Sequence, residues 1–221
     1  YAKNSKMGDF MEIWDLYDKD KNLTGQTHIR GNVIPEGCYH LVVHVVIRNS
    51  KGEYLIAQRD AERQSYPLLF EFVGGSILAG ETSLEGGVRE VYEELGVKLN
   101  PEKGKLIHSE VREAFNGKQF SDIMDVWYFE YNGDFDLEKA TTKEVLTAEW
   151  ATIAKIKQRF EDGSFVPTLD FIFDVDKKLR EKDKKNKLNK NKKKAGQSKD
   201  KSKYFDYYDD VKHDSHRDIA W

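Results

Sequence analysis

The sequence predicts an α/β domain followed by a charged extension, and three features of the chain support this. Segments rich in β-branched and apolar residues lie both before and after one amphipathic helical pattern near the middle of the chain. A second helical region follows the last of these segments. Beyond it the composition becomes lysine-rich and almost free of apolar residues, which is typical of a solvated segment that packs into no core.

The expected strands share a high content of β-branched and aromatic residues, and polar turns separate them. They cover residues 11–17, 26–33, 41–47, 53–58, 68–73, 106–112, 123–131 and 148–151. The segment 41–47 is nearly all apolar, which indicates a central strand that is buried on both faces. Turns are expected at 18–22, 49–52 and 116–118. A helix is expected over 152–160, and Pro167 suits the first turn of another.

The clearest helical pattern begins at Thr82. Thr82 and Glu85 have the spacing of a capping box, in which each residue's side chain bonds the other's backbone. Leu84, Val88, Val91 and Leu95 then recur at helical spacing and form one apolar face. Gly96 fits the position at which the chain turns out of a helix. The pair at 86–87 is unusual, because each glycine within a helix costs roughly 1 kcal/mol relative to alanine.

Three carboxylates share another face of this helix. Glu90, Glu93 and Glu94 lie within one turn, and carboxylates that close repel one another unless cations lie between them. Mg²⁺ prefers such oxygen ligands and is commonly shared with substrate phosphates. Arg89 is spaced to pair with either Glu85 or Glu93. The alternative is an acidic helix face that is simply solvated.

The residues around this helix resemble the signature of the Nudix hydrolases. Gly75 is followed after five residues by Glu81, and seven further residues lead to Arg89-Glu90-Val91, Glu93-Glu94 and Gly96-Val97. The order of elements over residues 11–180 resembles the Nudix α/β/α sandwich, which has a mixed sheet between helices. Trp14-Asp15-Leu16-Tyr17-Asp18 and Tyr39-His40-Leu41-Val42-Val43-His44 are similar to the branch nearest to isopentenyl diphosphate isomerase.

The resemblance implies hydrolysis of a nucleoside diphosphate linked to another group, by attack of water at phosphorus with Mg²⁺ or Mn²⁺ as the cation. Glu90, Glu93 and Glu94 would bind the metals, and Glu90 or a neighbour would act as the base. The Gly75 carbonyl would be a further ligand. Glu81 and Arg89 would hold the loop and the helix in register. Arg89 would also be a catalytic residue, whereas Gly96 would have a structural role.

Further candidates lie outside this motif. The segment from Glu144 to Trp150 resembles a region of the mutator-preventing Nudix pyrophosphatases in which the first glutamate adds a metal ligand. The isomerases use a histidine near the position of His40 as a ligand, but a strand histidine without paired ligand spacing favours a place for His40 and His44 in the core or on the sheet surface. Arginines at 30, 59 and 63 could clamp phosphates or form surface ion pairs.

Two other functions are compared with hydrolysis. An isomerase of isopentenyl diphosphate needs an acid, and that family has a cysteine where this chain reads Val73-Gly74-Gly75. The single cysteine, Cys38, precedes a different strand and is expected to be a buried structural thiol. A Nudix domain that only binds a nucleotide is the second alternative, and the complete set of carboxylates argues against it.

Charge and composition divide the chain further. We expect a tag or flexible start over residues 1–10, a catalytic domain over 11–180 and a lysine-rich, then acidic and aromatic, tail over 181–221. Residues 1–176 carry a net charge of −11, which does not suggest a nucleic-acid-binding body. The lysine-rich run at 182–203 is expected to be a solvated helix extension, with RNA or an acidic membrane surface as the alternative partner. No membrane span is expected, a cytoplasmic location is the default, and a homodimer is possible.

Overall fold

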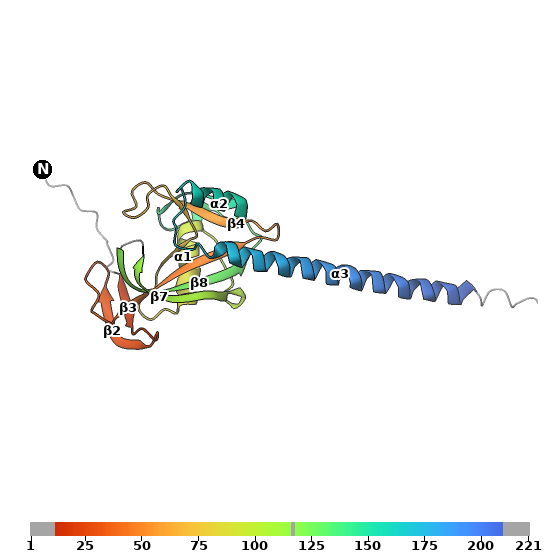
Figure 1. Ribbon diagram of the computed structural model, residues 1–221, viewed down its shortest axis with the longest axis horizontal. Coiled ribbons are helices and arrows are strands. Elements are labelled where there is room, and N and C mark those ends of the chain that lie inside the picture. Colours follow the sequence, from red (N-terminus) through yellow and green to blue (C-terminus); the bar gives the residue numbers. More distant parts are fainter. Residues whose placement is uncertain (1–11, 116–117, 210–221) are drawn as a thin grey trace, which may run out of the picture. The chain divides into compact units, whose positions relative to one another are not determined.

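The computed structural model describes residues 12–115 and 118–209, with side chains placed for residues 12–113 and 121–192. The chain divides into two compact units that meet between Leu169 and Asp170. The first unit contains every strand in the described residues, and the second contains one long helix (Figure 1). The expected limits of the catalytic domain, 11–180, and of the tail, 181–221, remain predictions.

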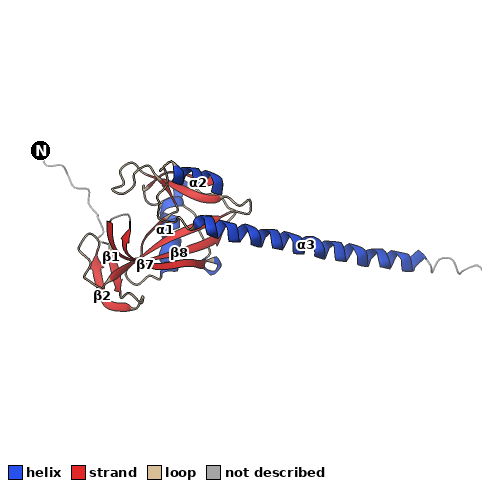
Figure 2. Cartoon of the chain, viewed as in Figure 1, coloured by secondary structure: helices blue, strands red, loops and turns tan. Residues whose placement is uncertain are grey.

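Within the described residues nine strands form one mixed sheet (Figure 2). They are β1 (Ile13–Tyr17), β2 (Leu23–Ile29), β3 (Tyr39–Arg48), β4 (Tyr54–Arg59), β5 (Phe70–Glu71), β6 (Gly74–Ser76), β7 (Lys105–Phe115), β8 (Lys118–Glu130) and β9 (Val145–Ala151). Strand β3 is central, as predicted, because it pairs with β1, β4, β6 and β8. Its pairing with β8 is parallel and the other strand pairs are antiparallel. The strand β2 extends the sheet beyond β1, while β5 and β9 both pair with β4 and β7 pairs with β8.

The sheet is buried on both faces by helices. Helix α1 (Ser83–Leu95) lies on one face, where a Cβ added at Gly87 would come 3.2 Å from Val43 and from Val45. Helix α2 (Ile153–Glu161) packs on the other, since its Phe160 stacks on Phe165 with ring centroids 4.7 Å apart. Phe165 in turn meets Phe72 edge-on, and Phe72 meets Tyr54 of β4 edge-on. The predicted arrangement of a mixed sheet between helices is confirmed.

Several predicted boundaries differ from the structure. Residues 68–73 do not form one strand: β5 pairs with β4, and the chain then crosses over so that β6 pairs with β3. Leu68 has a φ of +64°, so the expected strand does not begin there. Strand β2 begins at Leu23 rather than at 26, and β9 extends back to Val145. Residues 116–117 of the predicted turn lie outside the described part of the chain.

Two further expectations concern single residues. Pro167 lies in a turn and not in a helix, and helix α3 (Ile172–Asp209) starts five residues later. Cys38 is half-buried rather than buried, because it lies in the turn that precedes β3. Short 3₁₀ helices occupy Pro101–Lys103 and Leu137–Lys139.

The second unit contains α3, a continuous helix of 38 residues. At 1.5 Å per residue it is about 57 Å long. Its lysine-rich part shows no apolar stripe, and Leu188 is 60% exposed. None of the helices in the described residues combines the length and the apolar character that a membrane crossing requires.

Candidate active site

The local signals read from the sequence place helix α1 as expected. The Thr82 hydroxyl accepts a hydrogen bond from the Glu85 amide at 3.3 Å, and the Glu85 carboxylate accepts one from the Thr82 amide at 2.9 Å. This reciprocal pair satisfies amides that the first turn leaves without helical partners. Gly96 ends the helix in the left-handed region at φ +65°. A Cβ at Gly96 would come 2.2 Å from the Asp136 carbonyl oxygen, so the glycine also permits the close approach of the next segment.

The two glycines within α1 are explained by how closely the helix approaches the sheet. A Cβ at Gly86 would lie 2.4 Å from Ile77, and one at Gly87 would lie 3.2 Å from two valines of β3. Both positions are buried. The low helix propensity of glycine is therefore offset by packing that a larger residue would prevent. This close contact fixes the distance between α1 and the sheet, and therefore also the position of the acidic face of the helix.

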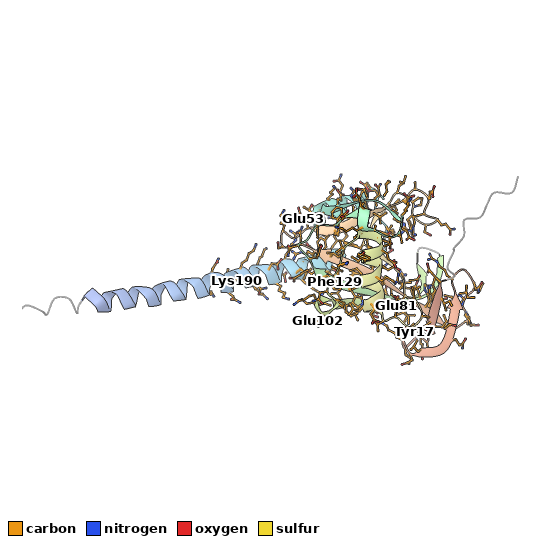
Figure 3. All side chains as sticks on the ribbon, turned by 180° about the vertical axis from the view of Figure 1, so that it is seen from behind. Tyr17, Glu53, Glu81, Glu102, Phe129 and Lys190 are labelled. Atoms are coloured by element: carbon orange, nitrogen blue, oxygen red, sulfur yellow. The ribbon has the colours of Figure 1, made fainter. Side chains whose placement is uncertain are left out.

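Arg89 links the loop before the helix to the helix itself. Its Nε and Nη2 donate to the two carboxylate oxygens of Glu81 at 2.8 and 3.0 Å, and Nη2 also donates to the Ser76 carbonyl at 3.0 Å. Its Nη1 donates to Glu90 at 2.9 Å and to Glu93 at 3.0 Å. Figure 3 labels Glu81 beside the helix. Of the two partners that helical spacing allowed, only Glu93 is used, because Glu85 is engaged in the capping box.

Gly75 brings the backbone of β6 against the carboxylate of Glu90. A Cβ at Gly75 would lie 2.3 Å from Oε1 of Glu90, so no larger residue can occupy this position with the carboxylate where it is. Gly75 is paired with Val43 of β3 in the sheet. The conformation of the loop and the position of the carboxylate are therefore coupled through this one contact.

Two of the helix carboxyl groups have strongly shifted acidity. Burial raises the pKa of Glu90 to about 7, partly opposed by Arg89 and reinforced by the negative charges of Glu93 and Glu144. Burial also raises the pKa of Glu94 well above its usual value. Glu94 is 4% exposed and lies within the electrostatic influence of Glu71, Glu90 and Glu144. Buried carboxyl groups this close share negative charge that only protons or cations can offset.

Sequence reasoning missed Glu71. It lies on β5, is 9% exposed, and forms an ion pair with Arg59 of β4. Burial raises its pKa, while the positive charge of Arg59 opposes that shift. A signal was present, because Glu71 is the one charged residue in the run 68–73 of apolar residues. A charge in such a run is rarely buried without a partner or a function.

Glu144 lies directly before β9 and is held beside the pocket by contacts with the loop that follows β4. The Asp60 amide donates to the Glu144 carbonyl at 2.8 Å, and Arg63 forms an ion pair with the Glu144 carboxylate. The predicted extra carboxylate thus lines the same pocket as Glu90 and Glu93.

These residues surround a pocket of about 550 Å³. Of the site residues proposed from the sequence, Gly75, Arg89, Glu90, Glu93 and Glu144 line it, as do His40, His44 and the arginines at 30, 59 and 63. Glu81, Glu94 and Gly96 are not among the lining residues. His44 is half-buried on β3, with Nδ1 3.4 Å from the Phe72 carbonyl oxygen, and burial lowers its pKa to about 4.

Across residues 12–113 and 121–192, no three carboxylate, imidazole or thiol groups are placed close enough to ligate one cation together. Guanidinium groups instead neutralise the carboxylates of the pocket. The donor set nevertheless suits a hard divalent cation, because it consists of carboxylate oxygens beside a backbone held open by Gly75. Glu90, Glu93, Glu94 and Glu144 are the groups that would hold such a cation.

The chain thus combines a mixed sheet between helices with an acidic helix face that lines a pocket. A model of the NUDIX domain matches residues 39–169 of this chain. The chain belongs to the Nudix hydrolases, and it is a Nudix pyrophosphohydrolase. It is 34% identical over 161 residues to an uncharacterized Nudix hydrolase of Listeria monocytogenes, a match that covers 71% of this chain and 89% of that protein. A second uncharacterized Nudix hydrolase, from Listeria innocua, is 36% identical over 160 residues with the same coverage.

Solved structures show the same fold. The DR0079 protein of Deinococcus radiodurans superposes with a TM-score of 0.56 at 21% identity, covering 76% of this chain and 98% of that one. A MutT protein of Methanosarcina mazei superposes with a TM-score of 0.50 at 22% identity, covering 64% and 95%. The NUDIX domain of Shewanella oneidensis NrtR, solved with ADP ribose, gives a TM-score of 0.50 at 14% identity and covers 68% and 94%. At these identities the likeness concerns the fold.

Proposed function

We propose that this enzyme hydrolyses a nucleoside diphosphate linked to another group, with Mg²⁺ or Mn²⁺ as the cofactor. The observation that supports this most directly is the convergence of Gly75, Glu90, Glu93 and Glu144 on one pocket, with Glu94 buried behind them. A pocket of about 550 Å³ is large enough for a nucleotide-sized ligand. One of the fold neighbours binds ADP ribose, so that compound is a natural first probe.

In this proposal the carboxylates of α1 and Glu144 hold the cation, and the arginines orient the phosphates. A bound divalent cation would offset phosphate charge and make a water molecule acidic enough to attack phosphorus. Glu90 is suited to accept the proton of that water, because burial has already raised its pKa to about 7, near the working pH. Arg59 and Arg63 line the same pocket. A planar guanidinium group can donate two parallel hydrogen bonds to two oxygens of one phosphate.

The experiment that tests this proposal is a hydrolysis screen with Mg²⁺ or Mn²⁺. The panel would contain nucleoside triphosphates, nucleotide sugars, dinucleotides, ADP-ribose and isopentenyl diphosphate, with products separated by chromatography. Glu94→Gln is the decisive variant and Glu102→Gln the matched control, since Glu102 is an exposed residue of the 3₁₀ helix after α1. We expect turnover to fall by at least 100-fold in Glu94→Gln and to be unchanged in Glu102→Gln.

Folding of Glu94→Gln is expected to be retained. The folded-state pKa of Glu94 lies above its unfolded value, so its ionisation opposes folding as the pH rises between the two. A neutral glutamine of the same shape removes that penalty, and the variant should unfold at an equal or higher temperature than the wild type at pH 8. An active and folded Glu94→Gln protein would contradict the proposed site. Conversion of isopentenyl diphosphate without phosphate release would contradict hydrolysis.

We further propose that the lysine-rich part of α3 does not take part in hydrolysis. Among the residues whose side chains the structure places, those that line the pocket all belong to the first of the two units. Deletion of residues 182–221 should therefore leave kcat and KM within about twofold of the full chain. A larger loss of kcat would show that the tail contributes to the site.

A further inference from the structure

Helix α3 carries a strong positive charge that the proposed function does not use. Residues 177–203 of this helix, here called the basic segment, contain 14 Lys and Arg and 3 Asp and Glu, a net charge of +11. Residues 1–176 carry a net charge of −11. The described residues that line the pocket lie between Glu12 and Glu144, so hydrolysis does not account for the charge of the basic segment.

The lysines of the basic segment are exposed all around the helix. Successive residues of an α-helix are rotated by about 100° about its axis, and at this rotation six of the lysines leave no gap wider than about 80° between neighbouring directions. All six side chains are exposed, and they are those of Lys182, Lys184, Lys185, Lys187, Lys190 and Lys192. Figure 3 labels Lys190 among them. A ligand that meets most of this charge must carry anionic groups on more than one side of the helix.

Cations one turn apart in the basic segment repel one another. Lys184, Lys187 and Lys190 follow one another at intervals of three residues, a spacing at which like charges destabilise a helix. Anionic groups placed between these side chains remove the repulsion. A single small anion reaches only one or two of the lysines, whereas a polyanion reaches many of them at once. The charge pattern of the basic segment therefore indicates a polyanionic ligand.

Two kinds of polyanionic surface match the basic segment poorly. A helix that lies on an anionic membrane needs an apolar face that enters the lipid. Leu179 and Leu188 are the large apolar residues of the basic segment, and nine residues at about 100° each place them on opposite sides of the helix. A single-stranded nucleic acid is held largely by stacking of its bases on aromatic side chains, and the basic segment contains none.

The dimensions of α3 match the major groove of duplex DNA. An α-helix with its side chains is about 10–12 Å in diameter, and the major groove is about 12 Å wide. Phosphates run along both edges of this groove, so a helix within it meets anionic groups on two sides. The basic segment is about 40 Å long at 1.5 Å per residue, which is more than enough to cross the groove. The corresponding groove of duplex RNA is deep and narrow.

We propose that the basic segment binds the phosphates on both edges of the major groove of duplex DNA, without preference for base sequence. Its cations are lysines except for Arg180, and lysine binds phosphate as a point charge. The commonest specific base contact is a bidentate one from arginine or lysine to guanine, and Arg180 is already paired with Asp176 at 2.6 Å. The inference is independent of the proposed function.

Binding of labelled duplexes by the full chain, followed by fluorescence anisotropy, tests the proposal. The probes are two DNA duplexes of about 20 base pairs with unrelated sequences, a duplex RNA and a single-stranded DNA of the same length. Vesicles that contain phosphatidylserine are tested by co-sedimentation. At about 50 mM KCl we expect a dissociation constant on the order of 1 μM for duplex DNA, agreement of the two sequences within about twofold, and binding of the other probes about 5-fold or more weaker.

The dependence on salt reports the number of phosphate contacts. With about six contacts, a plot of the logarithm of the association constant against the logarithm of the KCl concentration should have a slope of about −5. Removing two or three contacting lysines should lower the magnitude of that slope by about 2.

Two variants of equal net charge separate the basic segment from the rest of the chain. The tail variant replaces five exposed lysines of α3 by glutamine, a residue of similar helix propensity, at Lys184, Lys185, Lys187, Lys190 and Lys192. The control variant replaces five exposed lysines of the first unit by glutamine, at Lys51, Lys98, Lys103, Lys105 and Lys157. We expect the tail variant to bind duplex DNA at least about 10-fold more weakly than the wild type, and the control variant to bind it within about twofold.

The outcomes decide this inference separately from the proposed function. Wild-type affinity in the tail variant, an equal loss in both variants, or no binding of duplex DNA at low salt would each overturn it. Binding of duplex RNA, single-stranded DNA or vesicles as tight as that of duplex DNA would overturn the groove as the binding site. Hydrolysis of the small substrate is a separate readout, and we expect kcat of the tail variant to equal that of the wild type.

Discussion

Replacing Gly75 with alanine is expected to lower kcat strongly without unfolding the protein. A Cβ at this position would lie 2.3 Å from Oε1, 2.4 Å from Cδ and 2.7 Å from Oε2 of Glu90. Ordinary contact requires about 3.5 Å, so the carboxylate must move by about 1 Å. It can do so, because it is the far end of a flexible side chain. The φ of Gly75 lies outside the left-handed region, so the backbone accepts alanine.

The displacement determines the expected size of the effect. A misplacement of about 1 Å in a reacting group can reduce a rate by about 10²-fold. Rotation of the Glu90 side chain away from its preferred geometry costs roughly 0.5–1.5 kcal/mol. We therefore expect kcat to fall by about 100-fold, with a loss in unfolding free energy of about 1 kcal/mol. Turnover of the substrate found in the screen and urea unfolding would measure the two quantities.

Gly74→Ala is the contrasting variant. Its Cβ would lie 2.1 Å from the Val43 carbonyl oxygen and 3.0 Å from the His44 Cα, which are backbone atoms of the central strand. These atoms cannot move without disrupting the sheet, so we expect the free energy of unfolding to fall by about 3 kcal/mol or more. Wild-type kcat in Gly75→Ala would refute the reasoning about Glu90. Equal destabilisation by both variants would refute the distinction between a flexible and a fixed neighbour.

Three further predictions concern the helix and its cation. Gly87→Ala raises the helix propensity by roughly 1 kcal/mol, but its Cβ would crowd Val43 and Val45 at 3.2 Å. Because the crowding costs more than the propensity adds, we expect the free energy of unfolding in urea to fall by about 1 kcal/mol. Arg89→Lys removes most of the five hydrogen bonds that Arg89 donates to carboxylate and carbonyl oxygens. We expect the free energy of unfolding, measured in urea, to fall by about 2 kcal/mol, and kcat to fall as well. Because burial raises the pKa of Glu90 to about 7, the proton must leave before a cation binds, and the increase in melting temperature caused by Mg²⁺ should be larger at pH 8 than at pH 6. An increase independent of pH would contradict the last of these.

Helix α1 could be predicted because its determinants are local. The capping box at Thr82 and Glu85 and the left-handed residue Gly96 are each visible within a few positions of the chain. The same locality explains why Arg89 was predicted to pair with Glu85 or Glu93, each one turn away, and the structure shows the pair with Glu93. The spacing of these residues is sufficient to place the acidic face, since helical geometry admits little variation.

The parts that the sequence did not predict depend on contacts between distant segments. Residues 68–73 look like one strand, yet β5 and β6 pair with different neighbours, and nothing local marks the crossing between them. The placement of Glu71 beside Glu94 follows from that crossing. The ion pair of Arg112 with Asp122 joins two antiparallel strands, and its pairing register sets the contact. Such pairs become visible only once the register is known.

The charge balance of the pocket connects its stability with its chemistry. Guanidinium groups neutralise several of its carboxylates, and burial raises the pKa of Glu90 and Glu94. The pairs are Arg89 with Glu90 and Glu93, Arg63 with Glu144, and Arg59 with Glu71. Burial favours the protonated form of Glu94, which has no such pair among the described contacts. In the proposed function, Glu90 and Glu94 would have to lose their protons to hold a cation, because burial raises the pKa of both groups. The cation would then supply the positive charge that offsets these carboxylates, and Arg59 and Arg63, which line the same pocket, would be available to bind phosphate oxygens.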